Sequence, residues 1–216
     1  MKKIFAVFVL ICGISSSGFS QAAPLGKDLI KSFSEKMQSY QTIQADFSFT
    51  LENLQEGISD THKGKLSFKG KKYFLDLMGM EVYFDGTTKW QFIPEANEVT
   101  ISKPTSLEGG FFEDPTQIFS DYEKDFKSKF VGEKVEKGVS LYEVELYPED
   151  ISVQYTIIKI VFKKQNLEPL SIKYQGKDGI NYIINVSRFK ANTPVRDQEF
   201  TFDPSKHKKI EVIDLR

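Results

Sequence analysis

VYFDGTTKWQFIPEANEVTI, residues 82–101, carries the turn and strand patterns of two consecutive β-hairpins. Asp85-Gly86 is a dipeptide that tight hairpin turns favour, and Pro94–Asn97 is a longer polar turn. Because side chains alternate along a strand, Trp90 and Phe92 share one face of the strand between these turns. The stretch contains no nucleophile, no histidine pair and no metal cluster, so its aromatic face needs an explanation other than catalysis.

The same alternation of apolar and polar residues continues along most of the chain and predicts a mainly β fold with some helix (α+β). One amphipathic helix is expected at residues 25–40, where apolar residues recur at helical spacing. Turns rich in Gly and Asn separate the strands, which predicts a long antiparallel meander. The candidate strands are residues 44–52, 63–69, 71–78, 80–84, 87–93, 98–102, 126–135, 139–147, 155–163, 170–175, 180–190, 199–202 and 209–215.

The apolar faces of these strands suggest what the sheet encloses. A twisted antiparallel sheet of about ten or eleven strands tends to curl, which gathers its apolar faces on the concave side of an incomplete barrel. Helices covering that side would leave room for an apolar ligand, as in hydrophobic-ligand carriers. The residues alone also fit a sandwich whose aromatic side chains only fill a packed core, and aromatic stripes are more often core.

Residues 1–22 have the three parts of a secretory signal peptide. Two lysines form a positive start, an apolar run follows, and a segment of small residues ends the stretch. Cleavage is expected after Ser20 or after Ala22. The mature chain, residues 23–216, is then a single domain, and its expected location is the periplasm.

Cys12, the only cysteine, lies within the apolar run and is expected to leave with the signal peptide. The alternative is a lipidated cysteine, but Ile11 precedes it where lipidation requires a small residue. A mature chain without cysteine has no disulfide, no thiol catalysis and no cysteine-based zinc site.

Composition and motifs argue against an enzyme and against a nucleic-acid partner. The formal net charge is −1, and no basic run is interleaved with aromatic residues. His62 lies in a polar turn and His207 near the end; both are expected to be solvated, without the spacing of a metal site. The chain has no Gly-x-Ser-x-Gly motif and no Gly-rich phosphate loop, so no catalytic residue, cofactor or metal is predicted.

PTSLEGGFFEDPTQIFSDY, residues 104–122, interrupts the predicted strands. Gly109-Gly110 breaks regular structure, and Asp114-Pro115 is a helix start with Asp as the N-cap. A short helix would place three apolar residues on one side, behind two further aromatics. The segment is either a connection that plugs one end of the sheet or a movable lid, whose apolar residues are Phe111, Phe112, Ile118, Phe119 and Tyr122.

Five stretches, taken in order, carry a family resemblance: YQTIQADFSFTLEN, GKLSFKGKKYFLDL, YFDGTTKWQFIPEANEVT, DPTQIF and EFTFDPSKHKKIEVIDLR. Each pattern is common on its own, but their order and spacing, together with the signal peptide, are specific. Over most of its mature length the chain resembles the LolA family, the periplasmic carriers of outer-membrane lipoproteins.

The resemblance implies an incomplete antiparallel barrel whose concave apolar face is covered by helices and binds the acyl chains of lipoproteins. The implied partners are acylated lipoproteins, an ATP-driven inner-membrane transporter that releases them, and an outer-membrane acceptor. A monomer is expected. A related lipid-binding acceptor or sensor domain of the same fold is the alternative.

The resemblance also implies roles for particular residues. The family typically has an Arg-Pro pair after the second strand, and the arginine helps to hold the lid shut. Here Gly70 and Lys71 occupy that place, so Lys71 and Lys72 are the candidates for a latch. The expected cavity wall is formed by Phe47, Phe49, Leu51, Leu66, Phe68, Phe74, Val82, Phe84, Trp90 and Phe92.

Overall fold

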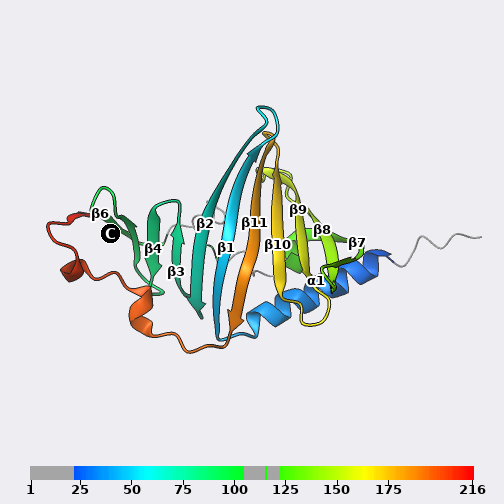
Figure 1. The fold of residues 1–216 in the computed structure, drawn as a ribbon, viewed down its shortest axis with the longest axis horizontal. Coiled ribbons are helices and arrows are strands. Elements are labelled where there is room, and N and C mark those ends of the chain that lie inside the picture. Colours follow the sequence, from blue (N-terminus) through cyan, green and yellow to red (C-terminus); the bar gives the residue numbers. More distant parts are fainter. Residues whose placement is uncertain (1–21, 105–114, 116–121) are drawn as a thin grey trace, which may run out of the picture.

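The computed structural model describes residues 22–104, 115 and 122–216 of the chain (Figure 1). Within these residues, twelve strands form one sheet that is not closed into a barrel, in the order β12-β6-β5-β4-β3-β2-β1-β11-β10-β9-β8-β7. The strands are β1 (Thr42–Asn53), β2 (Ile58–Lys69), β3 (Lys72–Leu77), β4 (Met80–Phe84), β5 (Lys89–Ile93), β6 (Glu98–Ser102), β7 (Phe126–Glu136), β8 (Val139–Pro148), β9 (Tyr155–Lys163), β10 (Pro169–Gly176), β11 (Ile180–Ala191) and β12 (Glu211–Asp214).

The quoted hairpins are confirmed. The β4–β5 turn is held by Asp85, whose Oδ1 accepts hydrogen bonds of 2.8 Å from the backbone N–H groups of Thr87 and Thr88. This is the local bonding that makes aspartate a frequent turn residue. The β5–β6 turn ends at Asn97, which adopts a positive φ of 51°, a conformation that asparagine tolerates better than most residues.

The predicted amphipathic helix is α1 (Ala22–Gln38), and its apolar side packs on the β7–β11 half of the sheet (Figure 1). The ring of Phe33 stacks on Phe162 of β9 with centroids 5.1 Å apart. Just after the helix, Tyr40 contacts the ring of Phe189 on β11. Among the described residues, none of the helices combines the length and the apolar character needed to cross a membrane.

The sheet has apolar residues on both faces, which form two separate clusters. The larger cluster joins α1 to one face of β1–β4 and β7–β11, called the first face below. The smaller cluster is built on Phe92, Val99 and Phe202, with Tyr83, Trp90 and Ile210 packed against it. It lies on the opposite face of β4–β6, called the second face below, under the carboxy-terminal segment of residues 192–216.

That carboxy-terminal segment differs from the prediction in two ways. Residues 199–202 were expected as a strand, but the first two of them belong to a 3-10 helix, η3 (Asp197–Phe200), which is followed by a second, η4 (Pro204–Lys206). The last strand, β12, pairs in parallel with β6, whereas an entirely antiparallel meander was expected. The count of twelve described strands also exceeds the expected ten or eleven. After β11 the chain passes below the ends of β1 and β2 to the far edge of the sheet (Figure 1).

Candidate functional site

The first face is a set of apolar rows that cross several strands. Leu66, Leu75 and Val82 are register partners on β2, β3 and β4, and each is at most 2% exposed. On β1, Phe47 and Phe49 are buried in the same cluster. Such rows present apolar surface with no hydrogen-bonding group, which suits an apolar ligand or an ordinary core.

The ten residues predicted to form one cavity wall divide between the two faces. Seven belong to the first face, where five are buried and two are partly buried: Phe47, Phe49, Leu51, Leu66, Phe68, Val82 and Phe84. The other three, Phe74, Trp90 and Phe92, lie on the second face, because Tyr83 is the register partner of both Phe74 and Trp90. The single wall predicted from the sequence is therefore wrong for these three residues.

The second face is a compact aromatic cluster covered by the carboxy-terminal segment. Phe202 contacts the rings of Phe92 and Tyr83 at 5.0 and 5.6 Å. His207 was expected to be solvated, but its ring stacks on Phe202 at 4.9 Å and contacts Phe92 at 4.5 Å. This histidine therefore packs as an aromatic residue, and Trp90 lies beside the same cluster.

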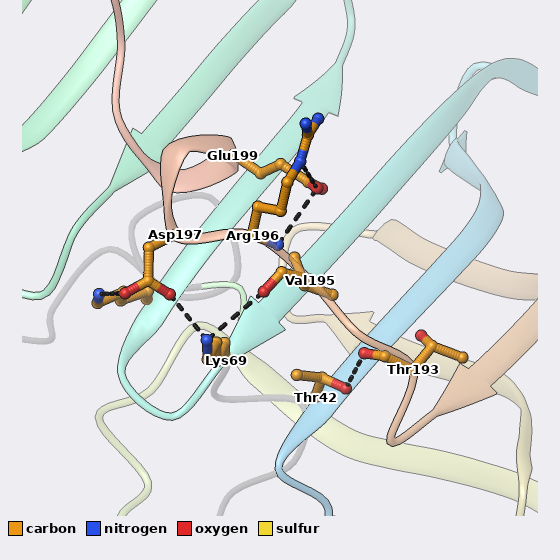
Figure 2. A network of polar contacts seen from close by, with 8 residues as sticks. Thr42, Lys69, Thr193, Val195, Arg196, Asp197 and Glu199 are labelled. Atoms are coloured by element: carbon orange, nitrogen blue, oxygen red, sulfur yellow. Dashed lines mark hydrogen bonds and ion pairs between the residues drawn. The ribbon is translucent and has the colours of Figure 1, made fainter.

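Polar contacts fasten the carboxy-terminal segment to the ends of β1 and β2 (Figure 2). Thr42 donates its hydroxyl hydrogen bond to the carbonyl of Thr193 over 2.7 Å. Lys69 Nζ lies 2.8 Å from one carboxylate oxygen of Asp197 and 3.5 Å from the carbonyl of Val195. These contacts thus attach the segment to the sheet just after β11, before the segment reaches the smaller cluster on the second face.

The candidate latch residue Lys72 joins the same contact. Its Nζ lies 2.8 Å from the other carboxylate oxygen of Asp197. Hydrogen bonds from Lys69 and Lys72 lower the pKa of Asp197 to about 2. Lys71 is exposed. The partner that the structure shows for Lys72 is therefore in the carboxy-terminal segment; a latch for the lid stays a prediction.

Of the five predicted lid residues, the structure describes Tyr122, which begins α2 (Tyr122–Asp125) and is 2% exposed. Its ring contacts Phe126 at 5.7 Å, and the hydroxyl of Tyr122 hydrogen-bonds to that of Tyr174. Phe111, Phe112, Ile118 and Phe119 lie outside the described residues, so their role as a lid stays a prediction.

Tyr155 and Tyr174 are two first-face residues that the sequence reasoning missed. Their rings meet edge to face at 5.5 Å, and Tyr155 also stacks on Phe126 at 6.3 Å. Burial raises the pKa of Tyr122, Tyr155 and Tyr174, so all three stay protonated and able to donate at neutral pH. The sequence does indicate that Tyr174 belongs to an apolar strand face, because it alternates with polar residues in its strand. Tyr155 reaches this face only because the β9–β10 register shifts opposite Gly176.

Among the described residues, no three or more His, Cys, Asp or Glu side chains are grouped in a way that could hold a metal ion. His62 is bonded to Asp60 over 2.8 Å near the tip of the β1–β2 hairpin, where it is partly exposed rather than fully solvated.

Comparisons with known proteins agree with this fold. A family model described as "Outer membrane lipoprotein carrier protein LolA" matches residues 38–203. An uncharacterized conserved protein from Thermus thermophilus is similar in structure, with a TM-score of 0.57, 11% identity, and coverage of 87% of this chain and 98% of that one. No curated protein matches the chain.

Two further solved structures are similar at lower scores. A LolA superfamily protein from Nitrosomonas europaea has a TM-score of 0.42 and 13% identity, covering 82% of this chain and 97% of that one. A chain of the MucA/MucB complex from Pseudomonas aeruginosa has a TM-score of 0.40 and 14% identity, covering 82% and 61%. Because the family model spans more than half of the sequence, the chain belongs to the LolA family.

Proposed function

We propose that this protein is a periplasmic carrier that binds the acyl chains of lipoproteins and moves them from the inner to the outer membrane. The observation that carries the proposal is the apolar first face of β1–β4, which is continuous across four strands of an open sheet. Membership of the LolA family supports the same function. The proposed binding surface consists of the seven predicted wall residues that lie on this face.

The physics of acyl chains fits such a surface. Each methylene removed from water contributes about 0.8 kcal/mol, so a chain of about fifteen methylenes contributes roughly 12 kcal/mol in total. An acyl chain has no hydrogen-bonding group, so a polar pocket would gain nothing from it. Binding of an acyl chain would replace contacts between side chains by contacts between side chains and the chain. The backbone hydrogen bonds of the sheet are unaffected, and reversible loading is therefore compatible with a stable fold.

The remaining parts of the proposal rest on the signal-peptide pattern and on the resemblance to the family. Residues 1–22 direct export and are removed, and residues 23–216 act as a monomer in the periplasm. The cargo comes from an ATP-driven inner-membrane transporter and is handed to an outer-membrane acceptor. In this proposal, Phe111, Phe112, Ile118, Phe119 and Tyr122 form the lid over the bound chains.

Two phenylalanines on adjacent strands provide a matched test of the binding surface. Phe84 lies on the first face and Phe74 on the second, and both are partly buried. Losing one apolar contact of this size with the cargo costs about 1.5–3 kcal/mol, so Phe84→Ala should weaken lipoprotein binding roughly tenfold or more. Phe74→Ala should leave binding close to that of the wild type.

The measurement is the release of a labelled lipoprotein from inner-membrane spheroplasts into the soluble fraction after addition of the purified mature protein. Thermal unfolding of both variants establishes that each is folded at the assay temperature. The proposed function is wrong if the wild-type protein keeps no lipoprotein in the soluble fraction. The proposed face is wrong if Phe74→Ala impairs release as strongly as Phe84→Ala.

A further inference from the structure

The β1–β2 hairpin projects past the neighbouring strand β3 (Figure 1). β1 pairs with the whole of β2, Ile58–Lys69, whereas β3 pairs only with residues 64–69 of β2. β2 lies between β1 and β3 in the strand order. Among the described strands, residues 58–63 of β2 therefore have a neighbour on the β1 side alone. Their unpaired side is called the open edge below.

The turn between β2 and β3 determines which backbone groups point to the open edge. Only residues 70–71 separate the two strands, so Lys69 and Lys72 form a hydrogen-bonded pair. Backbone groups of successive residues point to opposite neighbours, so the N–H and C=O groups of the odd-numbered residues of β2 point to the β3 side. For Ser59 and Thr61 no described strand lies there, and no described turn or loop bonds to their backbone groups.

The open edge adjoins the first face. Phe49 and Leu51 of that face are the register partners of His62 and Asp60. The side chains of Asp60 and His62 therefore lie on the same side of the sheet as the proposed acyl-binding residues, and they bond to each other over 2.8 Å. The apolar surface thus ends at a polar border, beside which the backbone groups of exposed residues 59 and 61 point to water.

These backbone groups restrict the kind of ligand that fits the open edge. Unpaired N–H and C=O groups along a strand bind an extended polypeptide, which presents the same groups at the same spacing. An edge of six residues is short, so a free peptide would gain little from it after losing its own freedom. A peptide tethered to acyl chains on the first face would bind more readily, because the tether raises its local concentration.

We propose that the open edge of β2 binds the polypeptide of the cargo, just after its acylated cysteine, as an added β-strand. The acyl chains then lie on the first face, and the residues after the cysteine pair with the backbone of Ser59 and Thr61. Because backbone groups make these contacts, cargoes of different sequence would be accepted. The inference rests on the proposed function, and it adds a site for the part of the cargo that an apolar surface does not bind.

Two lipopeptide probes test this pairing. Each carries a dipalmitoyl-glyceryl cysteine followed by the same six uncharged residues, and in one probe every backbone nitrogen of those six residues is methylated. Methylation removes the N–H donors and leaves the acyl chains unchanged. Equilibrium binding to the mature protein should favour the unmodified probe about tenfold, the size expected for two neutral hydrogen bonds.

Thr61→Pro removes one N–H group from the open edge, and Thr61→Val is its matched control. Proline is tolerated in a strand where its nitrogen faces no partner strand, so the variant should fold. Both substitutions lose the 2.8 Å contact between the hydroxyls of Thr61 and Thr50. Thr61→Pro should lose most of the preference for the unmodified probe, and Thr61→Val should keep it. Thermal unfolding of both variants is measured alongside.

Hydrogen exchange at single amides tests the open edge without any substitution. In the free protein, the amides of Ser59 and Thr61 should exchange faster than those of Asp60 and His62, which point to β1. The unmodified probe should slow exchange at Ser59 and Thr61, and the methylated probe should not. Slow exchange in the free protein that depends on protein concentration would mean that a second copy occupies the open edge, which would contradict the inference.

The results distinguish a failure of this inference from a failure of the proposed function. If the wild-type protein binds both probes equally, the open edge takes no peptide and the carrier function stands. If Thr61→Pro is folded and keeps the full preference, other groups bind the peptide and the inference is wrong. If the wild-type protein binds neither probe, the proposed function fails and the inference fails with it.

Discussion

The ring of Phe47 on β1 lies directly over Gly64, its register partner on β2. A Cβ added to Gly64 would come within 2.4 Å of Phe47 Cζ. Phe47 is 5% exposed and belongs to the larger cluster on the first face, so its ring has little space to move away. The glycine thus provides the space in which a central aromatic of the first face packs.

Gly64→Ala is therefore expected to destabilise the protein by about 1–3 kcal/mol, the usual cost of overpacking a core. Chemical denaturation of the mature protein measures the change. Gly132→Ala on β7 is the control, because a Cβ there meets nothing within 4 Å, and it should change stability by less than about 0.5 kcal/mol. Equal stability of the two variants would mean that the Phe47 ring moves freely.

The contact of Asp197 with Lys69 and Lys72 predicts an acid-dependent contribution to stability. The pKa of Asp197 falls from an ordinary 3.8 to about 2 in the folded protein. A lowered folded pKa stabilises the fold at a pH above the unfolded value, and this contribution disappears as the pH falls from about 4 to about 2. Asp197→Asn should lower the melting temperature at pH 7 and lose that effect near pH 2.

Melting temperatures of the wild type and of Asp197→Asn, measured from pH 7 to pH 2, check this expectation. Glu95→Gln, an exposed change in the β5–β6 turn, is the control and should leave the curve unchanged. A constant difference between wild type and Asp197→Asn across the whole range would show that the ion pairs are not its source.

Trp90 is expected to report on the carboxy-terminal segment and not on ligands of the first face. Trp90 packs against the smaller cluster on the second face, in which Phe202 is 4% exposed. Phe202→Ala should cost about 3–5 kcal/mol and shift Trp90 emission to longer wavelength as water reaches the ring. A saturating lipopeptide should leave the emission of the wild type unchanged. A clear shift on lipopeptide binding would mean that ligands reach the second face.

Gly26 determines how closely α1 approaches β7. A Cβ at this position would lie 2.7 Å from the backbone nitrogen of Phe130, and a backbone cannot rotate away as a side chain can. Alanine favours helix by about 1 kcal/mol over glycine, so an isolated helix would gain from Gly26→Ala. We expect the protein to lose about 1–3 kcal/mol instead, because α1 must move off the sheet.

Chemical denaturation again provides the measurement for Gly26→Ala. Ser32→Ala, at an exposed position of the same helix, shows what helix preference alone contributes, and it should be neutral or slightly stabilising. A net gain in stability from Gly26→Ala would contradict the close approach of α1 to β7.

Alternation predicts which side chains share a strand face, but not on which side of the sheet that face lies. Trp90 and Phe92 do share a face, as the sequence indicates. Both sides of β5 are covered, and Lys89, which alternates with Trp90, is itself 5% exposed. A single sequence contains no pattern that distinguishes the first face from the second here, so the predicted wall joined residues of both.

The strand expected at residues 199–202 is a different kind of error. Glu199 to Phe202 alternates as a strand does, and this local alternation is what predicts a strand there. In the structure, Asp197 is bound by lysines from β2 and from the start of β3, and Phe200 is fully buried. Contacts between residues far apart in the sequence therefore override the local preference.

The pairing of β1 with β11 has a consequence for the order of folding. Strands β1–β6 and β7–β11 each pair with neighbours in the chain, so both groups can form as local meanders. Joining them requires Ile43 to meet Ala191, at nearly opposite ends of the described chain. Such long-range closure is slow. Until it occurs, β1 has one unpaired edge beside Phe47 and Phe49, so refolding in dilute solution should outperform refolding in concentrated solution.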